Sequence, residues 1–256
     1  MRGALKALAL VIAALASRAI AAPPPPAVVA DPPCRAASFE GAHFTVCRYR
    51  GGVDELRLAS QGPRGPIGSL AGLRRALGPD AARVAFAMNA GMYDPAQQPL
   101  GLFVAGGVEQ RPLNRATSGY GNFLLLPNGV FWVGDDGAPH VDETGAFAAL
   151  PRAHVAWATQ SGPLLVRGGA LNAHISANGP SLNIRNAVGV RGTQALFVIS
   201  DEPVSFGRLA RFLRDGLGCP DALYLDGGVS GLWAPELARL DPTAGLGTFV
   251  LVLSRG

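Results

Sequence analysis

Short strand-like segments, separated by turn residues, run through the sequence from residue 43 to residue 253. Each is a run of apolar or alternating side chains of the kind that forms a β-strand. The expected strands cover residues 43–49, 53–59, 83–88, 101–105, 108–110, 122–126, 130–133, 155–159, 164–167, 187–190, 195–200, 223–225 and 248–253. Their number predicts a fold built on one large sheet, mixed or antiparallel.

Three glycine-containing pairs predict tight turns between neighbouring strands, and one of them is Gly106-Gly107, between residues 101–105 and 108–110. Gly51-Gly52 separates the first two expected strands. Asn128-Gly129 separates two later ones, and Asn-Gly is the pair that best fits the geometry of a two-residue hairpin turn. We therefore expect a β-hairpin at each of these positions.

Two segments have helical periodicity. Residues 205–217 place four apolar side chains near one face, begin with Ser205 as an N-cap and stop before Gly218. Residues 69–77 repeat leucine at helical spacing. Two or three helices among many strands indicate the α+β class. Roughly 220 folded residues are enough for a single domain with one core.

The N-terminal segment has the layout of a secretory signal. Arg2 and Lys6 precede an apolar run, and Ala19-Ile20-Ala21 offers a cleavage site. The alternative is an uncleaved anchor, but the apolar run is short for a bilayer span. We expect residues 1–21 to be a signal peptide, 22–39 a proline-rich leader and 40–256 the folded domain. The mature protein would be periplasmic or secreted, with no stable membrane span.

The charge of the chain changes when this signal is removed. Residues 1–21 contain three of the 22 basic residues and none of the 18 acidic ones, which leaves 19 basic against 18 acidic residues. A nearly neutral chain lacks the basic surface that nucleic-acid binding requires. We therefore expect no nucleic-acid partner.

Three cysteines stand at positions 34, 47 and 219. In an oxidising compartment Cys34 and Cys47 are the natural pair, because they close a short loop near the start of the domain. Cys219 would then be a buried free thiol, and a disulfide that uses Cys219 in place of Cys34 is the alternative.

Polar residues among glycines mark four segments next to expected strands. Glycine lets backbone N–H groups approach a ligand closely, and loops at strand ends commonly carry function. Turn formation is the plain alternative for each segment. The four segments cover residues 88–94, 159–163, 181–186 and 224–231.

These segments resemble the phosphodiester glycosidase domain family, and most closely its exported bacterial branch. The similarity extends over about residues 40–253 and is carried by Phe44-Thr45-Val46-Cys47, Met88-Asn89-Ala90-Gly91-Met92-Tyr93-Asp94, Pro99-Leu100-Gly101-Leu102, Gln160-Ser161-Gly162-Pro163-Leu164-Leu165, Arg185-Asn186-Ala187-Val188-Gly189-Val190, Phe197-Val198-Ile199-Ser200 and Leu223-Tyr224-Leu225-Asp226-Gly227-Gly228-Val229-Ser230. The eukaryotic branch typically has a third glycine where this chain has Val229, which bears on the sugar pocket.

The resemblance implies hydrolysis of a sugar 1-phosphodiester. Such a reaction needs a carboxylate near the anomeric carbon and donors for the phosphate. We expect Asp226, then Asp94, to be the catalytic carboxylates and Arg185 to bind the phosphate. The other expected substrate contacts are Asn89, Gly91, Gln160, Ser161, Asn186, Gly227, Gly228 and Ser230.

The sequence leaves three functional questions open. No cofactor is assigned with certainty, and a divalent cation held by carboxylates has no identifiable ligands. A non-catalytic protein that binds a sugar phosphate or an envelope polysaccharide is the main alternative to the hydrolase. The identity of the sugar and of the group beyond the phosphate is also open.

Overall fold

A computed structural model describes residues 32–63, 65–119, 121–226 and 228–254. Its largest sheet has seven strands, and every neighbouring pair in it is antiparallel. In spatial order these strands are β1 (Cys34–Phe39), β2 (Ala42–Arg50), β16 (Gln194–Ser200), β15 (Asn186–Arg191), β17 (Asp221–Tyr224), β13 (Leu164–Arg167) and β14 (Ala170–Leu171).

Two five-stranded antiparallel sheets and two short strand pairs complete the β structure of the described residues. One sheet contains β11 (Pro139–Glu143), β10 (Gly129–Gly134), β12 (Val155–Ser161), β8 (Phe103–Ala105) and β9 (Val108–Arg111). The other contains β19 (Arg239–Leu240), β18 (Leu232–Ala234), β7 (Val84–Asn89), β21 (Phe249–Leu253) and β3 (Glu55–Ala59). The short pairs are β20 (Ala244–Leu246) with β6 (Gly68–Ser69), and β4 (Gln61–Gly62) with β5 (Gly65–Pro66).

The described residues form three α-helices: α1 (Leu70–Leu77), α2 (Thr144–Ala148) and α3 (Phe206–Arg211), with α3 continuing as a π-helical turn to Gly216. Ser69 caps α1 and Ser205 caps α3, because each hydroxyl accepts a hydrogen bond from a backbone N–H of the first turn. Both expected helices are therefore confirmed. The α+β class is confirmed as well, with the strands divided among several sheets.

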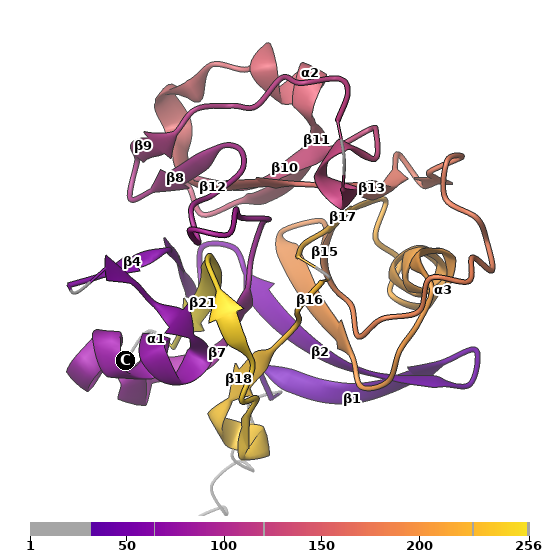
Figure 1. Ribbon diagram of the computed structural model, residues 1–256. Helices are drawn as coiled ribbons and strands as arrows, with labels where there is room; N and C mark the ends of the chain where they lie inside the picture. Colours follow the sequence, from indigo (N-terminus) through magenta and orange to yellow (C-terminus); the bar gives the residue numbers. More distant parts are fainter. Residues whose placement is uncertain (1–31, 64, 120, 227, 255–256) are drawn as a thin grey trace, which may run out of the picture. The chain divides into compact units, whose positions relative to one another are not determined.

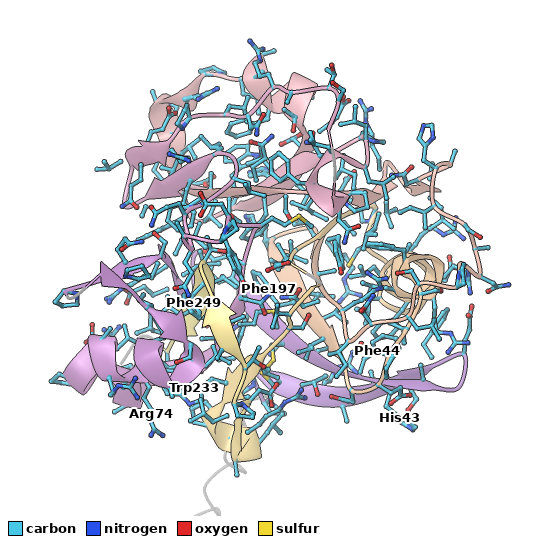
Figure 2. The ribbon with its side chains drawn as sticks, in the orientation of Figure 1. His43, Phe44, Arg74, Phe197, Trp233 and Phe249 are labelled. Carbon is cyan, nitrogen blue, oxygen red and sulfur yellow. A yellow bond between two sulfur atoms is a disulfide. The ribbon has the colours of Figure 1, made fainter. Side chains whose placement is uncertain are left out.

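The three larger sheets share one hydrophobic core. Phe197 of β16 contacts Phe86 of β7 and Phe131 of β10, with ring centroids 5.5 Å and 5.4 Å apart. One aromatic side chain from each sheet thus meets at the centre. Figure 2 shows Phe197 within the body of the domain, whereas His43 and Arg74 are exposed.

β16 is buried on both faces because the seven-stranded sheet has a second core behind it. Successive side chains of a strand point to opposite faces. Phe197 and Ile199 therefore join the shared core, while Leu196 and Val198 pack in the cluster that contains Leu209 of α3. Figure 1 shows α3 beside the sheet that contains β15 and β16.

Two of the three expected hairpins are wrong, whereas the third is confirmed, because β8 and β9 pair antiparallel across Gly106-Gly107. β2 and β3 flank Gly51-Gly52 but belong to different sheets, β2 pairing with β16 and β3 with β21. Asn128 is buried instead of lying in an exposed turn. Its Nδ2 donates to the Phe123 carbonyl at 3.0 Å, and its Oδ1 accepts from the Thr144 hydroxyl at 2.8 Å. Tertiary hydrogen bonds thus override the local turn preference of Asn-Gly.

The folded unit begins earlier than residue 40. Residues 32–256 form one compact unit, and Cys34–Phe39 is already a strand, so the leader cannot extend to residue 39. A disulfide joins Cys34 to Cys47, residues that face each other in the β1–β2 pair. Cys219 is a buried free thiol, and burial raises its pKa to about 11. The expected signal peptide lies outside the described residues.

Candidate active site at the end of β17

All four polar segments found in the sequence meet where β17 ends. Tyr224 pairs with Ala187 of β15, and the next two residues then leave the seven-stranded sheet. The backbone N–H of Leu225 donates to Asn186 at 3.1 Å, and that of Asp226 donates to Ala90, just beyond β7, at 3.0 Å. The segment after β17 therefore crosses from one sheet to another and places Asp226 at their junction.

Asn89, the last residue of β7, holds this crossing segment in place. Its side chain is fully buried, and Nδ2 donates to the carbonyls of Asp226 and Val229 at 2.9 and 2.8 Å. Its Oδ1 accepts from the N–H of Gly231 at 3.0 Å and from Asn186 Nδ2 at 3.1 Å. The amide of Asn89 is thus fully used by the protein, so this residue positions the loop and presents no free group to a substrate.

Asn186 and Ser230 extend the same network. Asn186 is fully buried, and its Nδ2 also donates to the Asn89 carbonyl at 2.8 Å. Ser230 is half-buried, and its hydroxyl donates to the Ile184 carbonyl at 3.0 Å. Ser230 and the exposed Gly228 are the expected contact residues that keep access to solvent here, while Gly227 lies outside the described residues.

Asp226 is half-buried and has no cationic partner among the described residues. The hydrogen bond to its carboxylate that meets normal geometry comes from the backbone N–H of Gly228, at 3.3 Å from Oδ1. Burial raises the pKa of Asp226 above its ordinary value of 3.8, and the donors around it oppose that rise only in part. An isolated, partly desolvated carboxylate at a strand end is a typical functional group.

Tyr93 lies beside Asp226 and had no role assigned from the sequence. Burial is the main reason that the pKa of Tyr93 is raised, and the negative charge of Asp226 is the second. The hydroxyl lies close enough to help hold down the pKa of Asp226, yet no hydrogen bond of normal geometry joins the two. Its place between Met92 and Asp94, inside a polar glycine segment, is the sequence signal that could have identified it.

Gly91 and Asp94, both expected at the site, have structural roles here. A side chain at Gly91 would lie 2.3 Å from the Thr159 hydroxyl and 2.4 Å from the Gln160 carbonyl, so glycine permits a close approach to β12. Asp94 Oδ1 accepts from the N–H of Gln98 at 2.9 Å and closes a turn. Neither arrangement requires a ligand.

Arg185, the expected phosphate ligand, is fully buried. Its Nε donates to the Val204 carbonyl at 2.9 Å, Nη1 to the Tyr224 hydroxyl at 2.7 Å and Nη2 to the Ser181 carbonyl at 2.9 Å. Its guanidinium also stacks 3.6 Å above the Phe206 ring. A phosphate cannot reach this guanidinium in the described structure, which corrects the expectation.

Gln160 and Ser161, expected at the site, are also buried scaffold residues. Gln160 exchanges hydrogen bonds with the backbone of Asn114 at 2.9 and 2.8 Å and donates to the Thr144 hydroxyl at 3.1 Å. The Ser161 hydroxyl donates to the Leu225 carbonyl at 3.1 Å. Ser161 therefore holds Leu225, the residue between β17 and Asp226, and Gln160 ties β12 to the loop that contains Asn114.

A second concentration of acids lies around the ends of β2 and β10 and the starts of β3 and β12. Asp54, Glu55, Asp135 and Asp136 line a cavity of about 330 Å³. Most of them are ion-paired, with Asp54 at 2.6 Å from Arg50 and Asp135 at 2.9 Å from a histidine. In the part of the chain that the structure describes, no three His, Cys, Asp or Glu side chains are grouped to hold a metal ion.

The family model described as phosphodiester glycosidase matches residues 82–242, well over half of the chain. The chain belongs to the phosphodiester glycosidase family. This membership confirms the resemblance seen in the sequence, and the matched range includes Tyr93 and Asp226.

Relatives of this phosphodiester glycosidase domain extend the comparison. The uncharacterized protein YigE of Escherichia coli (strain K12) is 37% identical over 154 residues, which are 59% of this chain and 58% of that protein. The match therefore spans less than two thirds of that relative. The chain also covers 82% of the catalytic domain of zebrafish N-acetylglucosamine-1-phosphodiester alpha-N-acetylglucosaminidase, auto-inhibited by its pro-peptide.

The solved structures establish the fold of the family domain. The zebrafish enzyme aligns over 87% of this chain with a TM-score of 0.59 and 15% identity. A hypothetical protein from Synechocystis aligns over 87% of this chain and 61% of its own, with a TM-score of 0.51 and 17% identity. At these identities the likeness concerns the fold alone.

Proposed function

We propose that this protein hydrolyses a sugar 1-phosphodiester and releases the free sugar and a phosphate monoester. Family membership supports the class of reaction. The observation that carries the proposal is the state of Asp226, a half-buried carboxylate without a described cationic partner, in a loop fixed by Asn89. The distant zebrafish relative acts on an N-acetylglucosamine 1-phosphodiester, and we carry that substrate type over as part of the proposal.

In the proposed reaction the bond between the anomeric carbon and the phosphate oxygen breaks. The departing group is a phosphate monoester, a stable anion that does not require a strong general acid. Asp226 lies next to the anomeric carbon and stabilises the positive charge that develops there. The oxygen of a water molecule then bonds to the anomeric carbon, and one of its protons ends on the released phosphate.

The residues around Asp226 divide into two proposed roles. Ser230 and Gly228 keep access to solvent and provide contacts to the substrate. Asn89 and Asn186 hold the loop, so that the carboxylate is preorganised before substrate arrives. Asp94 remains a secondary candidate, since it follows Tyr93 directly in the chain.

We also propose that the protein acts in the periplasm or outside the cell. The signal-like residues 1–21 support this location, and the Cys34–Cys47 disulfide fits an oxidising compartment. Among the described residues no helix is long and apolar enough to cross a membrane. Cell fractionation that found the protein only in the cytoplasm would contradict the proposal.

The decisive experiment measures release of N-acetylglucosamine from an N-acetylglucosamine 1-(alkyl phosphate) by the purified protein. We expect Asp226→Asn to lower turnover by at least about 100-fold, a typical loss when a group that stabilises transition-state charge is removed. Asp135→Asn, an exposed aspartate from the second concentration of acids, is the matched control and should leave turnover unchanged. Full turnover by Asp226→Asn would refute the assignment, and tight binding by the wild type without hydrolysis would favour the binding protein.

A further inference from the structure

The Tyr93 hydroxyl is buried without a hydrogen-bond partner. Among the described residues it is the only buried side-chain nitrogen or oxygen in this state. Buried polar groups are nearly always paired, and an exception usually has a functional reason. Tyr93 therefore has a donor that no hydrogen bond of normal geometry uses in the free protein, although the Asp226 carboxylate lies near it.

The ring that carries this hydroxyl is held in place. Tyr93 forms an isolated β-bridge with Pro99 across a short turn. Its ring lies directly against the backbone of Gly247, where a side chain would come within 2.4 Å of the ring carbon Cγ. The glycine thus permits the ring position, and the hydroxyl cannot swing freely away from Asp226.

Tyr224 shows what a structural tyrosine looks like in the same region. It is fully buried, and its hydroxyl accepts a hydrogen bond from Arg185 at 2.7 Å. Burial raises the pKa of Tyr224 to about 12, and burial together with Asp226 raises that of Tyr93 as well. Both phenols therefore stay protonated at neutral pH, so Tyr93 can donate a hydrogen bond but does not act as a base.

From this geometry we infer that Tyr93 is a catalytic residue whose hydroxyl donates a hydrogen bond to the phosphate oxygen that leaves the anomeric carbon. The inference rests on the proposed function. The hydroxyl lies near the carboxylate of Asp226, which in the proposed reaction is beside the bond that breaks. As the bond breaks, negative charge accumulates on the oxygen and the hydrogen bond strengthens, while the proton stays on Tyr93. A donor left unpaired in the free protein is one whose energy becomes available in the transition state.

The test compares Tyr93→Phe with Tyr224→Phe, the matched removal of a buried hydroxyl. For Tyr93→Phe we expect kcat on the N-acetylglucosamine 1-(alkyl phosphate) to fall by about 10- to 100-fold with KM within about threefold. Inhibition by inorganic phosphate, which stands in for the leaving group, should weaken about tenfold. The melting temperature should stay the same or rise, because an unpaired buried hydroxyl has been removed. Tyr224→Phe should instead lower the melting temperature, because Arg185 loses an acceptor.

Each outcome separates this inference from the function on which it rests. Wild-type turnover in Tyr93→Phe, alongside an inactive Asp226→Asn, would overturn the role of Tyr93 and leave the function standing. A fall in melting temperature equal to that of Tyr224→Phe would show that the hydroxyl is structural, which also overturns it. If the wild-type protein hydrolyses no sugar 1-phosphodiester, the function fails. In that case the affinity for inorganic phosphate, measured by calorimetry, still tests the role of Tyr93. An affinity of Tyr93→Phe equal to that of the wild type would refute a hydrogen bond from the Tyr93 hydroxyl to phosphate.

Discussion

Two groups of polar side chains lie around the end of β17, and they differ in where their hydrogen bonds go. Asn89, Arg185 and Gln160 form the first group, in which the side chains are buried and bonded to the protein itself. Asp226 and Tyr93 form the second group. Asp226 has a raised pKa, and the Tyr93 hydroxyl has no hydrogen-bond partner. The first group stabilises the loop that contains Asp226, and the second group is available to interact with a substrate.

The two groups should respond differently to mutation. Removing a side chain of the first group leaves buried partners without bonds, which costs stability. Removing a polar group of the second group leaves the fold intact or more stable, because active sites commonly trade stability for function.

The largest effect on stability is expected for Arg185→Met. Methionine keeps much of the length and apolar contact of arginine but leaves the buried Val204 carbonyl, the Ser181 carbonyl and the Tyr224 hydroxyl without their donor. We expect the free energy of unfolding to fall by about 3 kcal/mol or more, since hydrogen bonds to charged groups contribute about 1.5–3 kcal/mol each. Urea denaturation followed by circular dichroism measures this loss.

Arg167→Met is the control for that change. Arg167 pairs with Glu143 at 2.7 Å, but its side chain is 61% exposed. Exposed ion pairs contribute little, so we expect a loss below about 1 kcal/mol. Wild-type stability in Arg185→Met, combined with weaker binding of phosphorylated sugars than of neutral sugars, would return Arg185 to the role of phosphate ligand and break the comparison.

A smaller loss is expected for Asn89→Ala, together with a loss of activity. The change removes the donors to Asp226 and Val229 and the acceptor for Gly231. We expect about 2 kcal/mol lower stability, because a lost buried hydrogen bond typically costs about 1–3 kcal/mol. Turnover should fall because the Asp226 loop loses its anchor.

The control for Asn89→Ala is Asn183→Ala, at an exposed asparagine whose side chain makes a long 3.4 Å hydrogen bond to Ser181. Its stability should stay within about 0.5 kcal/mol of wild type, as is usual for exposed positions. If Asn89→Ala kept full stability but lost affinity for the sugar, Asn89 would be a substrate contact and would no longer belong to the first group.

The sequence predicted which segments gather at the site better than it predicted what each residue does there. The four segments 88–94, 159–163, 181–186 and 224–231 do meet, because each adjoins a buried strand end. Polar residue types next to such strands are unusual enough to stand out in a sequence. Whether an amide such as Asn89 serves the protein or a ligand depends on tertiary neighbours, which composition and spacing do not contain.

The same limit explains the errors in the fold. The helix caps at Ser69 and Ser205 are local, and both were predictable. The Asn128-Gly129 hairpin was wrong because a buried asparagine found partners 5 and 16 residues away. Tyr93 escaped notice for a related reason, since the absence of a hydrogen bond is visible only in three dimensions.

The smallest effect on stability is expected for Asp226→Asn, and it is an increase where the other variants show a loss. Because the pKa of Asp226 is raised in the folded protein, the folded state binds the proton more tightly than the unfolded chain. The stability that this proton provides is present below the ordinary value of 3.8 and is lost as the pH rises through the raised pKa. At neutral pH the ionised carboxylate therefore costs stability, and asparagine removes that cost.

Denaturation of wild type and Asp226→Asn between about pH 7 and about pH 4 tests the sign directly. We expect the variant to be more stable at pH 7, by up to about 1 kcal/mol, because a partly buried charge without a paired partner has been removed. The advantage should shrink as the pH falls and the wild-type carboxyl becomes protonated. Asp135→Asn should show no gain at pH 7, because its hydrogen bond to His154 lowers the pKa of Asp135. A loss of stability in Asp226→Asn at pH 7 would mean that the carboxylate is bonded to the protein, which would move Asp226 into the first group and remove the physical basis for its catalytic role.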